Sequence, residues 1–443
     1  MNKGLAAIAL ASAVAVAACS NGNGAPPNAS RSLLPAAPAE RAASTTPIAH
    51  VLILIQENRS FDNFFARFPG ADGARYGRMH TGARTPLVQR SLTSQPIDHM
   101  HGAFLRAYDG GKMDGFDLEG LGRTGKTAGK VPYQYVDPAQ IAPYWSMAHQ
   151  YVLADHMFQT QGSGSFTAHQ ELIAGGTAID KTHSIIDLPT GSPWGCDAPT
   201  GTVTSLIDVD RHELVDQGPF PCLDYRTLGD LLDAKGISWK YYVSRSNVEW
   251  NAFDAIRAVR YGPEWETNLS LPNTSVFSDI ANGTLPAVSW LIPELVNSDH
   301  PGSHSDTGPS WVAQVVNAVG QSSLWKSTAI VVVWDDWGGF YDHEPPPQLD
   351  YQGLGFRVPM LIVSPYARPG YVSHTQYEFG SILRFVEDNW RLGSLHQTDA
   401  RATSIADAFA FASAPRPFAP IAAKYSRSYF EHQPPSDRPA DDQ

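Results

Sequence analysis

Two apolar runs of the sequence each end in a pair of polar residues that could hold a metal ion. These pairs are Glu57 and Asn58, after residues 51–55, and Asp335 and Asp336, after residues 329–334. Adjacent carboxylates repel one another unless a cation neutralises them, so two such pairs at one sheet edge predict a shared metal site. Taken singly, either pair could instead cap a helix or form a turn.

The ligand atoms of this predicted site narrow the choice of metal. All four side chains offer oxygen, and oxygen-rich sites suit calcium, magnesium or manganese. Zinc in proteins is usually bound by histidine or cysteine. We therefore expect a divalent ion of the first group in preference to zinc, unless a histidine joins the site.

A serine at the start of an expected helix is the candidate nucleophile. The stretch "QTQGSGSFTAHQELIAGG" places Ser165 directly before a helical pattern. Backbone N–H groups and the helix dipole at that position suit a bound phosphate. The same serine could serve only as a helix N-cap. The stretch is neither a G-x-S-x-G elbow nor a P-loop.

Several histidines lie in loops that are rich in Gly, Pro and Asp. The sequence has 15 histidines, and the candidates for chemistry are His99, His300, His343 and His374. A histidine in such a loop can bind phosphate oxygens as a cation or protonate a leaving oxygen.

The elements that must position these residues are short buried strands. Four apolar runs lack polar alternation, which is typical of parallel strands covered on both faces by helices. They span residues 51–55, 287–292, 329–334 and 358–363. Helical patterns separate them, so the sequence predicts an α/β sheet sandwiched between helices. Residues 180–225 are rich in Gly, Pro and Asp and predict a long ordered excursion near the substrate. Residues 426–443 are predicted to form a frayed tail.

Composition limits the class of protein. The chain has 443 residues, 42% of them hydrophobic, with a formal net charge of -12. This is enough apolar content for one large core and argues against disorder. The negative charge disfavours sequence-independent binding of nucleic acid, but a small anionic substrate could bind where a metal reverses the local field.

The N-terminus resembles a bacterial lipoprotein signal. Residues 1–18 carry one Lys and a short apolar stretch, and Cys19 would be lipidated, although an ordinary signal peptide is the alternative. Residues 19–47 read as a flexible tether. We therefore expect a lipid-anchored protein of the cell envelope, facing the periplasm or the exterior. In that oxidising compartment Cys196 and Cys222 predict a disulfide rather than two buried thiols, worth roughly 3–4 kcal/mol for a loop of about 27 residues.

Five stretches together resemble the bacterial phosphoesterase family that contains acid phosphatase A and the phosphatidylcholine-type phospholipases C. They are "QENRSFDNFF", "DHMHGAFLRAYDGGKMDGF", "VSWLIPELVNSDHPGSHS", "VVVWDDWGGFYDHEPPP" and "VSHTQYEFGSILRFVEDNW". The resemblance covers about residues 48–395, within a catalytic domain that we place at 48–425.

This resemblance implies an alkaline-phosphatase-like α/β core and hydrolysis of phosphate esters through a phosphorylated Ser or Thr. Carried over to this chain, it makes Ser165 the nucleophile. His99 and His300 would contact the phosphate or the leaving group. The metal ligands would be Glu57, Asn58, Asp335 and Asp336.

Two departures from the family pattern bear on the substrate and the metal. The familiar Asp-Glu pair is Asp335-Asp336 here, and the nucleophile block has Ser165 and His169 in place of the Gly-Pro-Thr and Asn-Arg of the phospholipases. These differences favour the acid phosphatase branch, with a phospholipase C as the alternative. A sulfatase would need a C/S-x-P-x-R motif, which this chain does not contain. A non-enzymatic surface lipoprotein is a further alternative.

Overall fold

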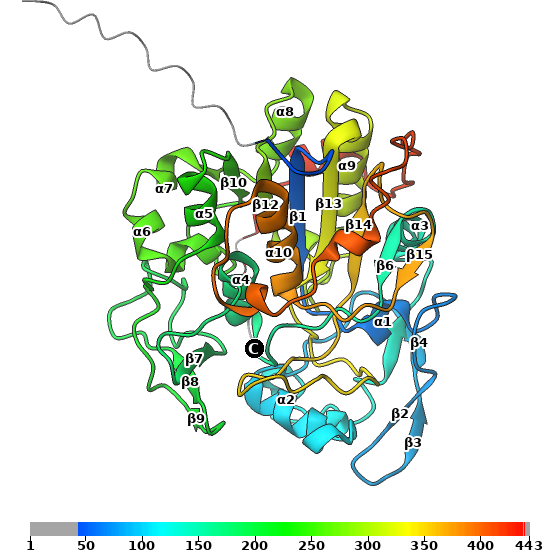
Figure 1. Cartoon of the computed structure of the whole chain (residues 1–443). Coiled ribbons are helices and arrows are strands. Elements are labelled where there is room, and N and C mark those ends of the chain that lie inside the picture. The colour runs from blue at the N-terminus through cyan, green and yellow to red at the C-terminus, as the bar shows by residue number, and fades with distance from the viewer. Residues whose placement is uncertain (1–42, 437, 439–443) are drawn as a thin grey trace, which may run out of the picture. The chain divides into compact units, whose positions relative to one another are not determined.

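The computed structural model describes residues 43–436 and 438 (Figure 1). The predicted signal peptide, the lipidated Cys19 and residues 19–42 of the predicted tether lie outside the described residues. The last residues of the tether are described, and Thr45 donates its N–H to the carbonyl of Asn389 over 2.7 Å. No helix within the described part of the chain combines the length and apolarity that crossing a membrane would need.

A mixed sheet of eight strands forms the centre of the described residues, in the order β11-β10-β12-β1-β13-β14-β6-β15. Its strands are β1 (His50–Gln56), β6 (Val152–Ala154), β10 (Trp239–Tyr242), β11 (Leu269–Ser270), β12 (Val288–Leu291), β13 (Thr328–Trp334), β14 (Met360–Val363) and β15 (Tyr371–Ser373). The four predicted apolar runs correspond to β1, β12, β13 and β14. The central strands β1 and β13 pair in parallel over their whole length, and β13 is fully buried.

Helices cover both faces of this sheet, which confirms the predicted α/β sandwich (Figure 1). The helices are α1 (Phe61–Phe65), α2 (His101–Tyr108), α3 (Ala142–Gln150), α4 (Ser165–Ala174), α5 (Leu228–Ala234), α6 (Arg257–Arg260), α7 (Glu264–Thr267), α8 (Ser275–Asn282), α9 (Gly308–Gly320), α10 (Phe379–Trp390) and α11 (Arg427–Glu431). Helices α4, α5 and α10 pack together in one layer, and α3, α8 and α9 in the other.

Strand β14 corrects one prediction, because it is antiparallel to both of its neighbours, β13 and β6. The apolar run at 358–363 reads like the other three, since burial on both faces gives the same pattern in either direction. The direction is set by the connection. The chain between β13 and β14 contains no helix among its described residues, and a parallel return would need a crossover that is usually helical.

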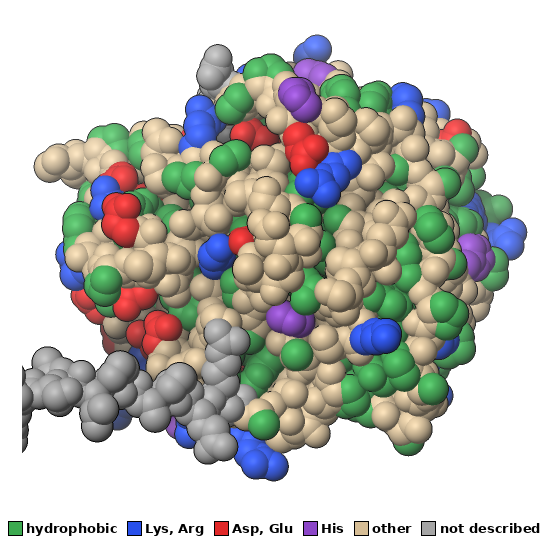
Figure 2. Space-filling model, turned by 90° about the horizontal axis from the view of Figure 1, so that it is seen from above, with side chains coloured by type: hydrophobic (Ala, Val, Ile, Leu, Met, Phe, Trp, Pro, Cys, Tyr) green, Lys and Arg blue, Asp and Glu red, His purple; other side chains and the backbone are tan. Residues whose placement is uncertain are grey.

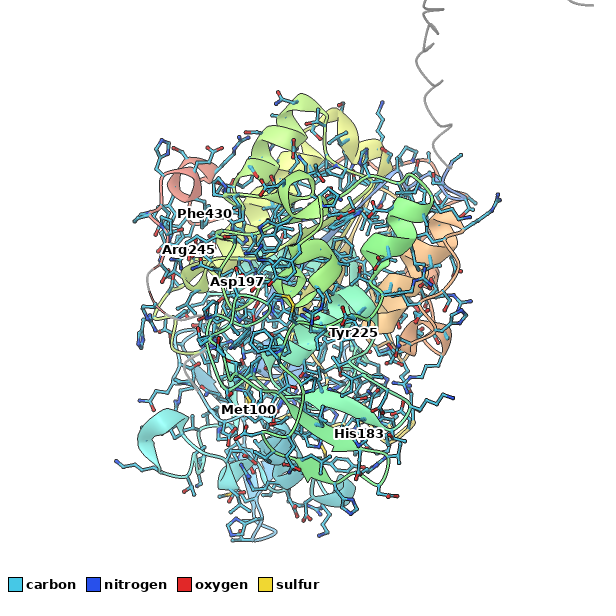
Figure 3. All side chains as sticks on the ribbon, turned by 90° about the vertical axis from the view of Figure 1, so that its left-hand side faces the viewer. Met100, His183, Asp197, Tyr225, Arg245 and Phe430 are labelled. Atoms are coloured by element: carbon cyan, nitrogen blue, oxygen red, sulfur yellow. A yellow bond between two sulfur atoms is a disulfide. The ribbon has the colours of Figure 1, made fainter. Side chains whose placement is uncertain are left out.

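The excursion at 180–225 is less irregular than the sequence suggests. It contains the small antiparallel sheet of β7 (His183–Ile186), β8 (Ser205–Asp208) and β9 (Glu213–Leu214). The predicted disulfide is present between Cys196 and Cys222, on the side of the molecule shown in Figure 3. Asp187 ties the excursion to the nucleophile loop, because its N–H donates to Ser163 Oγ over 2.6 Å.

The remaining short strands and the C-terminal region complete the fold. The strands are β2 (Tyr76–Arg78), β3 (Arg84–Pro86), β4 (Val88–Arg90) and β5 (Gln134–Val136). Part of the predicted frayed tail is folded as α11, where Ser426 caps the helix and buried Phe430 packs edge-on against Trp311. A single apolar contact of this kind gives no periodic signal in so short a segment.

Candidate active site

The polar residues that follow β1 and β13 meet at one edge of the sheet. Gln56 pairs with Trp334 in the parallel register, so both strands end side by side. The N–H of Asp335 donates to the carbonyl of Gln56 over 2.9 Å. Asn58 has a φ of 60° and turns the chain off the strand, so that its N–H donates to Asp335 Oδ1 over 2.8 Å. The predicted convergence of these residues is present.

Helix α4 brings the candidate nucleophile to the same edge. Its N-cap is Gly164, and Ser165 is its first helical residue. The hydroxyl of Ser165 therefore does not cap the helix but donates to Asp336 Oδ2 over 3.0 Å, while Asn58 Nδ2 lies 3.4 Å from Ser165 Oγ. The first N–H groups of a helix have no intrahelical acceptor, so they lie ready for an anion beside this hydroxyl.

His169 is a site residue that the sequence-based set of ligands did not include. It lies one helical turn after Ser165, and its Nε2 is 3.0 Å from Glu57 Oε1 and 3.9 Å from Asp335 Oδ2. The i,i+4 spacing of Ser165 and His169 was the available signal, because two such residues share one helix face. His169 is therefore the histidine that a zinc site at this position would need.

His99 lies on the other side of Asn58. Its Nδ1 is 2.8 Å from the carbonyl of Ile97, which fixes the ring with that nitrogen as the donor. Its Nε2 therefore faces the cluster, 2.8 Å from Asn58 Nδ2 and 3.5 Å from Asp336 Oδ2. In this orientation Nε2 accepts a hydrogen bond when His99 is neutral and can donate a proton when it is charged.

The buried charges of this cluster call for a cation. Glu57, Asp335 and Asp336 are all 0% exposed. Burial, followed by the charge of Glu57, raises the pKa of Asp335 well above its usual value, and His169 acts in the opposite direction. Glu57, His169 and Asp335 each offer a ligand atom within 4.8 Å of the others.

A second observation shows that the residues present fit a divalent ion. Asn58 Oδ1 is buried and has no hydrogen-bond partner among the described residues. An oxygen so placed beside three carboxylates is an available ligand for a cation. The set now includes an imidazole as well as oxygens, so the structure weakens the argument that disfavoured zinc.

His300 reaches the site from a third strand end, after β12. Its ring centroid is 6.0 Å from that of Trp250, which in turn stacks on His169 at 6.2 Å with an interplanar angle of 2°. The loop is held in place because the N–H of Glu57 donates to the carbonyl of Ser298 over 2.8 Å. His300 thus lies one aromatic ring away from the acidic cluster.

The stretch of sequence that contains these site residues matches a known protein family. Residues 48–393 match the Phosphoesterase family. The chain belongs to this family. Phospholipase C B of Mycobacterium tuberculosis is 24% identical to this phosphoesterase over 446 residues, which cover 85% of the chain and 80% of the relative. The non-hemolytic phospholipase C of Pseudomonas aeruginosa is 26% identical over 405 residues, which cover 77% of the chain and 54% of the relative.

A solved structure similar to this phosphoesterase is that of a protein in the alkaline phosphatase superfamily from Vibrio parahaemolyticus. The two share 10% sequence identity with a TM-score of 0.37, over 83% of this chain and 74% of the other. Family membership and the sequence relatives make the protein a phosphoric ester hydrolase. The family is generally metal-dependent, in keeping with the acidic and histidine cluster.

Two of the four candidate histidines of this phosphoesterase contact carboxylates outside the acidic cluster. His343 Nδ1 lies 2.8 Å from Asp62 Oδ2. His374 Nδ1 lies 2.8 Å from Asp155 Oδ2. Asp155 and His374 follow β6 and β15, so they belong to the same sheet edge as the acidic cluster but to its far side.

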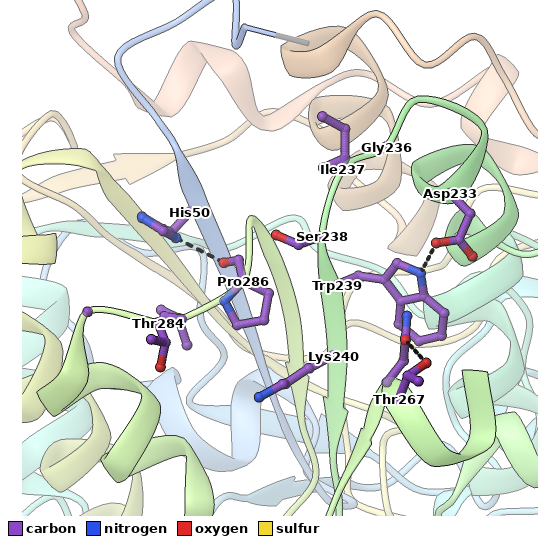
Figure 4. A pocket seen from close by; sticks show the side chains of 13 residues that line it. His50, Asp233, Gly236, Ile237, Ser238, Trp239, Lys240, Thr267, Thr284 and Pro286 are labelled. Carbon is purple, nitrogen blue, oxygen red and sulfur yellow. Dashed lines mark hydrogen bonds between the residues drawn. The ribbon is translucent and has the colours of Figure 1, made fainter. Parts of the chain in front are cut away.

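A large cavity lies at the opposite end of the sheet from this cluster. It has a volume of about 790 Å³ and is lined by the first residues of parallel strands, including His50 and Trp239, with Pro286 before β12 (Figure 4). Figure 2 shows the face at this end, where acidic and basic side chains both occur. Ligands of open α/β sheets bind beyond the carboxyl ends of the strands, whereas this cavity lies at their amino ends. We therefore do not assign it as the active site, despite its size.

Proposed function

We propose that this phosphoesterase hydrolyses phosphate esters through a phosphoserine intermediate on Ser165. The observation that carries the proposal is the 3.0 Å hydrogen bond from Ser165 Oγ to Asp336 Oδ2 at the N-terminus of α4. It places a hydroxyl, a proton acceptor and helix N–H groups at one point. Enzymes activate a serine nucleophile with an adjacent base in this way.

The first step uses groups of this chain. Asp336 takes the proton of Ser165 as Oγ forms a bond to phosphorus and the bond to the leaving oxygen breaks. The helix N–H groups stabilise the equatorial oxygens. A divalent ion held by Glu57, Asn58, Asp335 and Asp336, with His169 beside them, supplies positive charge that lowers the pKa of the attacking hydroxyl when it is bound.

The second step releases the phosphate. Water attacks phosphorus and passes a proton to His99, while the bond from phosphorus to Ser165 Oγ breaks and Asp336 returns to Oγ the proton that it took in the first step. His99 is placed to exchange protons, because its Nε2 is 3.5 Å from Asp336 Oδ2 and 2.8 Å from Asn58 Nδ2. We assign His300 to the binding of the phosphate or the leaving group, since Trp250 holds it beside the cluster.

Phosphomonoesters are the proposed substrates, as in an acid phosphatase, because Ser165 and His169 replace the residues typical of phospholipases in the nucleophile block. The names of the sequence relatives favour a second candidate, a phospholipase C that acts on phospholipid head groups. The two differ in whether the product is inorganic phosphate or a phosphomonoester.

Two parallel assays distinguish the candidates. p-Nitrophenyl phosphate and p-nitrophenyl phosphorylcholine would be compared in EDTA and after calcium, magnesium, manganese or zinc is added back. Faster turnover of the monoester supports the acid phosphatase, and faster turnover of the choline diester supports the phospholipase C.

The nucleophile is tested with a matched pair of variants. Ser165→Ala is expected to lower kcat by at least about a thousandfold. Ser275→Ala changes the first residue of another helix, α8, and is expected to keep full activity. After acid quenching of the native enzyme with substrate, a phosphorylated peptide containing Ser165 is expected. Full activity in a folded Ser165→Ala protein would overturn the proposal.

We also propose, from the sequence alone, that a lipid on Cys19 anchors the protein in the bacterial cell envelope. The support is the signal-like stretch at 1–18 and the cysteine that follows it. Incorporation of labelled fatty acid into the native chain, and its loss in Cys19→Ala, tests this. Equal labelling of both chains would contradict it.

A further inference from the structure

Arg59 connects three strand ends that carry active-site residues. It follows Asn58 at the end of β1, and its N–H donates to the carbonyl of Asp336, after β13, over 2.8 Å. Its guanidinium donates from Nε and Nη2 to the carbonyl of Asp299, after β12, over 2.9 and 2.6 Å. The segments joined in this way contain two of the predicted metal ligands and His300.

Every side-chain donor of Arg59 has an acceptor. Besides the two bonds to Asp299, Nη2 donates to the carbonyl of Leu92 over 2.7 Å. Nη1 donates to Asn63 Oδ1 and Ser94 Oγ over 3.2 and 3.3 Å. Burial lowers the pKa of Arg59 to about 10, so the side chain is still a cation at neutral pH. The planar fork of five donors matches these acceptors, whereas a lysine has three donors on one nitrogen and could not reach them all.

The residue that Arg59 holds has an unusual backbone conformation. Asp299 has a φ of 69°, in the left-handed region that is costly for residues other than glycine. Arg59 binds its carbonyl, and the hydroxyl of Tyr144 donates to its Oδ2 over 2.6 Å. These two buried contacts therefore stabilise a conformation that the isolated chain would disfavour.

The carbonyl of Asp299 belongs to the peptide bond that joins Asp299 to His300. Because a peptide bond is planar, the two bonds from Arg59 fix the plane from which His300 leaves the chain. The N–H of His300 donates to Ser298 Oγ over 3.2 Å, and its ring centroid lies 6.0 Å from that of Trp250. The place of the imidazole beside the acidic cluster thus depends on the backbone that Arg59 holds.

We infer that Arg59 is a positioning residue for His300, which sets the backbone before His300 and so places the imidazole at the phosphate or the leaving group. Arg59 itself does not touch the substrate. The inference rests on the proposed role of His300, but not on the phosphoserine step or on the choice between the two substrates. An arginine with a purely structural role would affect stability without changing what His300 contributes to the reaction.

The test is a double-mutant cycle measured as kcat/KM at saturating metal, with the faster of the two p-nitrophenyl esters. Arg59→Lys and His300→Gln are each expected to lower kcat/KM by at least about tenfold. Because Arg59 acts through His300, the double variant should be about as slow as the slower single variant. Losses that multiply to about a hundredfold or more, or a native kcat/KM in folded Arg59→Lys, would overturn the inference.

Arg357→Lys is the matched control, because Arg357 is also a buried arginine, pairs with Asp342 at 2.8 Å and lies over the ring of Phe61. Its effect should multiply with that of His300→Gln, and the same lack of additivity in this control would overturn the inference. Arg59→Gln, which buries no charge, replaces Arg59→Lys in the cycle if the lysine variant folds poorly.

Two further readouts separate the possible failures. The amount of metal needed for half-maximal activity should be the same in Arg59→Lys as in the native enzyme, and a raised amount would mean that Arg59 acts on the metal ligands instead. A native kcat/KM in His300→Gln would remove the proposed role of His300 and this inference together. Multiplying losses alongside an impaired His300→Gln would overturn the inference alone.

Discussion

Replacement of His169 by Gln tests whether the imidazole holds the active-site metal. His169 Nε2 is 3.0 Å from Glu57 Oε1 and 3.9 Å from Asp335 Oδ2, and the side chain is 1% exposed. If it is a ligand, its loss should weaken metal binding by at least about tenfold, which is about 1.4 kcal/mol. Gln keeps a polar group and much of the volume of His, so the fold should be retained. The ring stack with Trp250 is lost.

The assay strips the enzyme with EDTA and titrates each metal back against the rate of p-nitrophenyl phosphate hydrolysis. His169→Gln should need at least about ten times more metal for half-maximal activity, with kcat partly recovered at saturation. His149→Gln, an exposed histidine near the end of α3, is the control and should titrate like the native enzyme. An unchanged titration midpoint in folded His169→Gln would show that the histidine only neutralises Glu57, and the ligand assignment would be wrong.

Three further predictions concern the proton acceptor Asp336, the disulfide and the buried Glu387. Asp336→Asn cannot accept the proton of Ser165, so at saturating metal kcat should fall by about a hundredfold or more; a native kcat would contradict its role as base. Cys196→Ser/Cys222→Ser removes the disulfide between residues 26 positions apart. It should lower the free energy of unfolding by about 3 kcal/mol in denaturant melts, and an unchanged free energy of unfolding would contradict this prediction. Burial, followed by the charge of Asp399, raises the pKa of Glu387 from 4.5 to about 8, so its protonated form stabilises the fold and that stability is lost as the pH rises from about 4.5 through 8. Glu387→Gln should therefore gain stability relative to the native protein between pH 5 and 8, and a constant difference in melts across that range would refute the shift.

The sequence predicts most of the sheet because burial leaves a clear pattern. The runs that became β1 and β13 are uniformly apolar and end in acids, so both the strands and the meeting of their ends could be predicted. The direction of β14 could not, since its pattern records burial and not the path of the connection. Helix α11 was missed because Phe430 is its one buried residue and has no periodic partner in the sequence.

The site was predictable to the extent that its residues are adjacent in the chain or end a strand. Glu57, Asn58 and the two aspartates meet those conditions. His169 does not, because its part in the cluster depends on how α4 is rotated against the sheet, which packing sets. Its spacing from Ser165 indicates a shared face but not which face is directed at the acids.

The geometry of the acidic cluster also depends on a glycine that carries no chemistry. Gly338 has a φ of 62°, and a Cβ at that position would lie 2.1 Å from the carbonyl oxygen of Asn58. Its N–H donates to Asp336 Oδ1 over 2.8 Å, which leaves Oδ2 directed at Ser165. A side chain at 338 would push the two strand ends apart, because the backbones of Asn58 and Gly338 are already in contact. The short separation between Ser165 and its proton acceptor therefore rests on the backbone conformation after β13 as much as on the acids themselves.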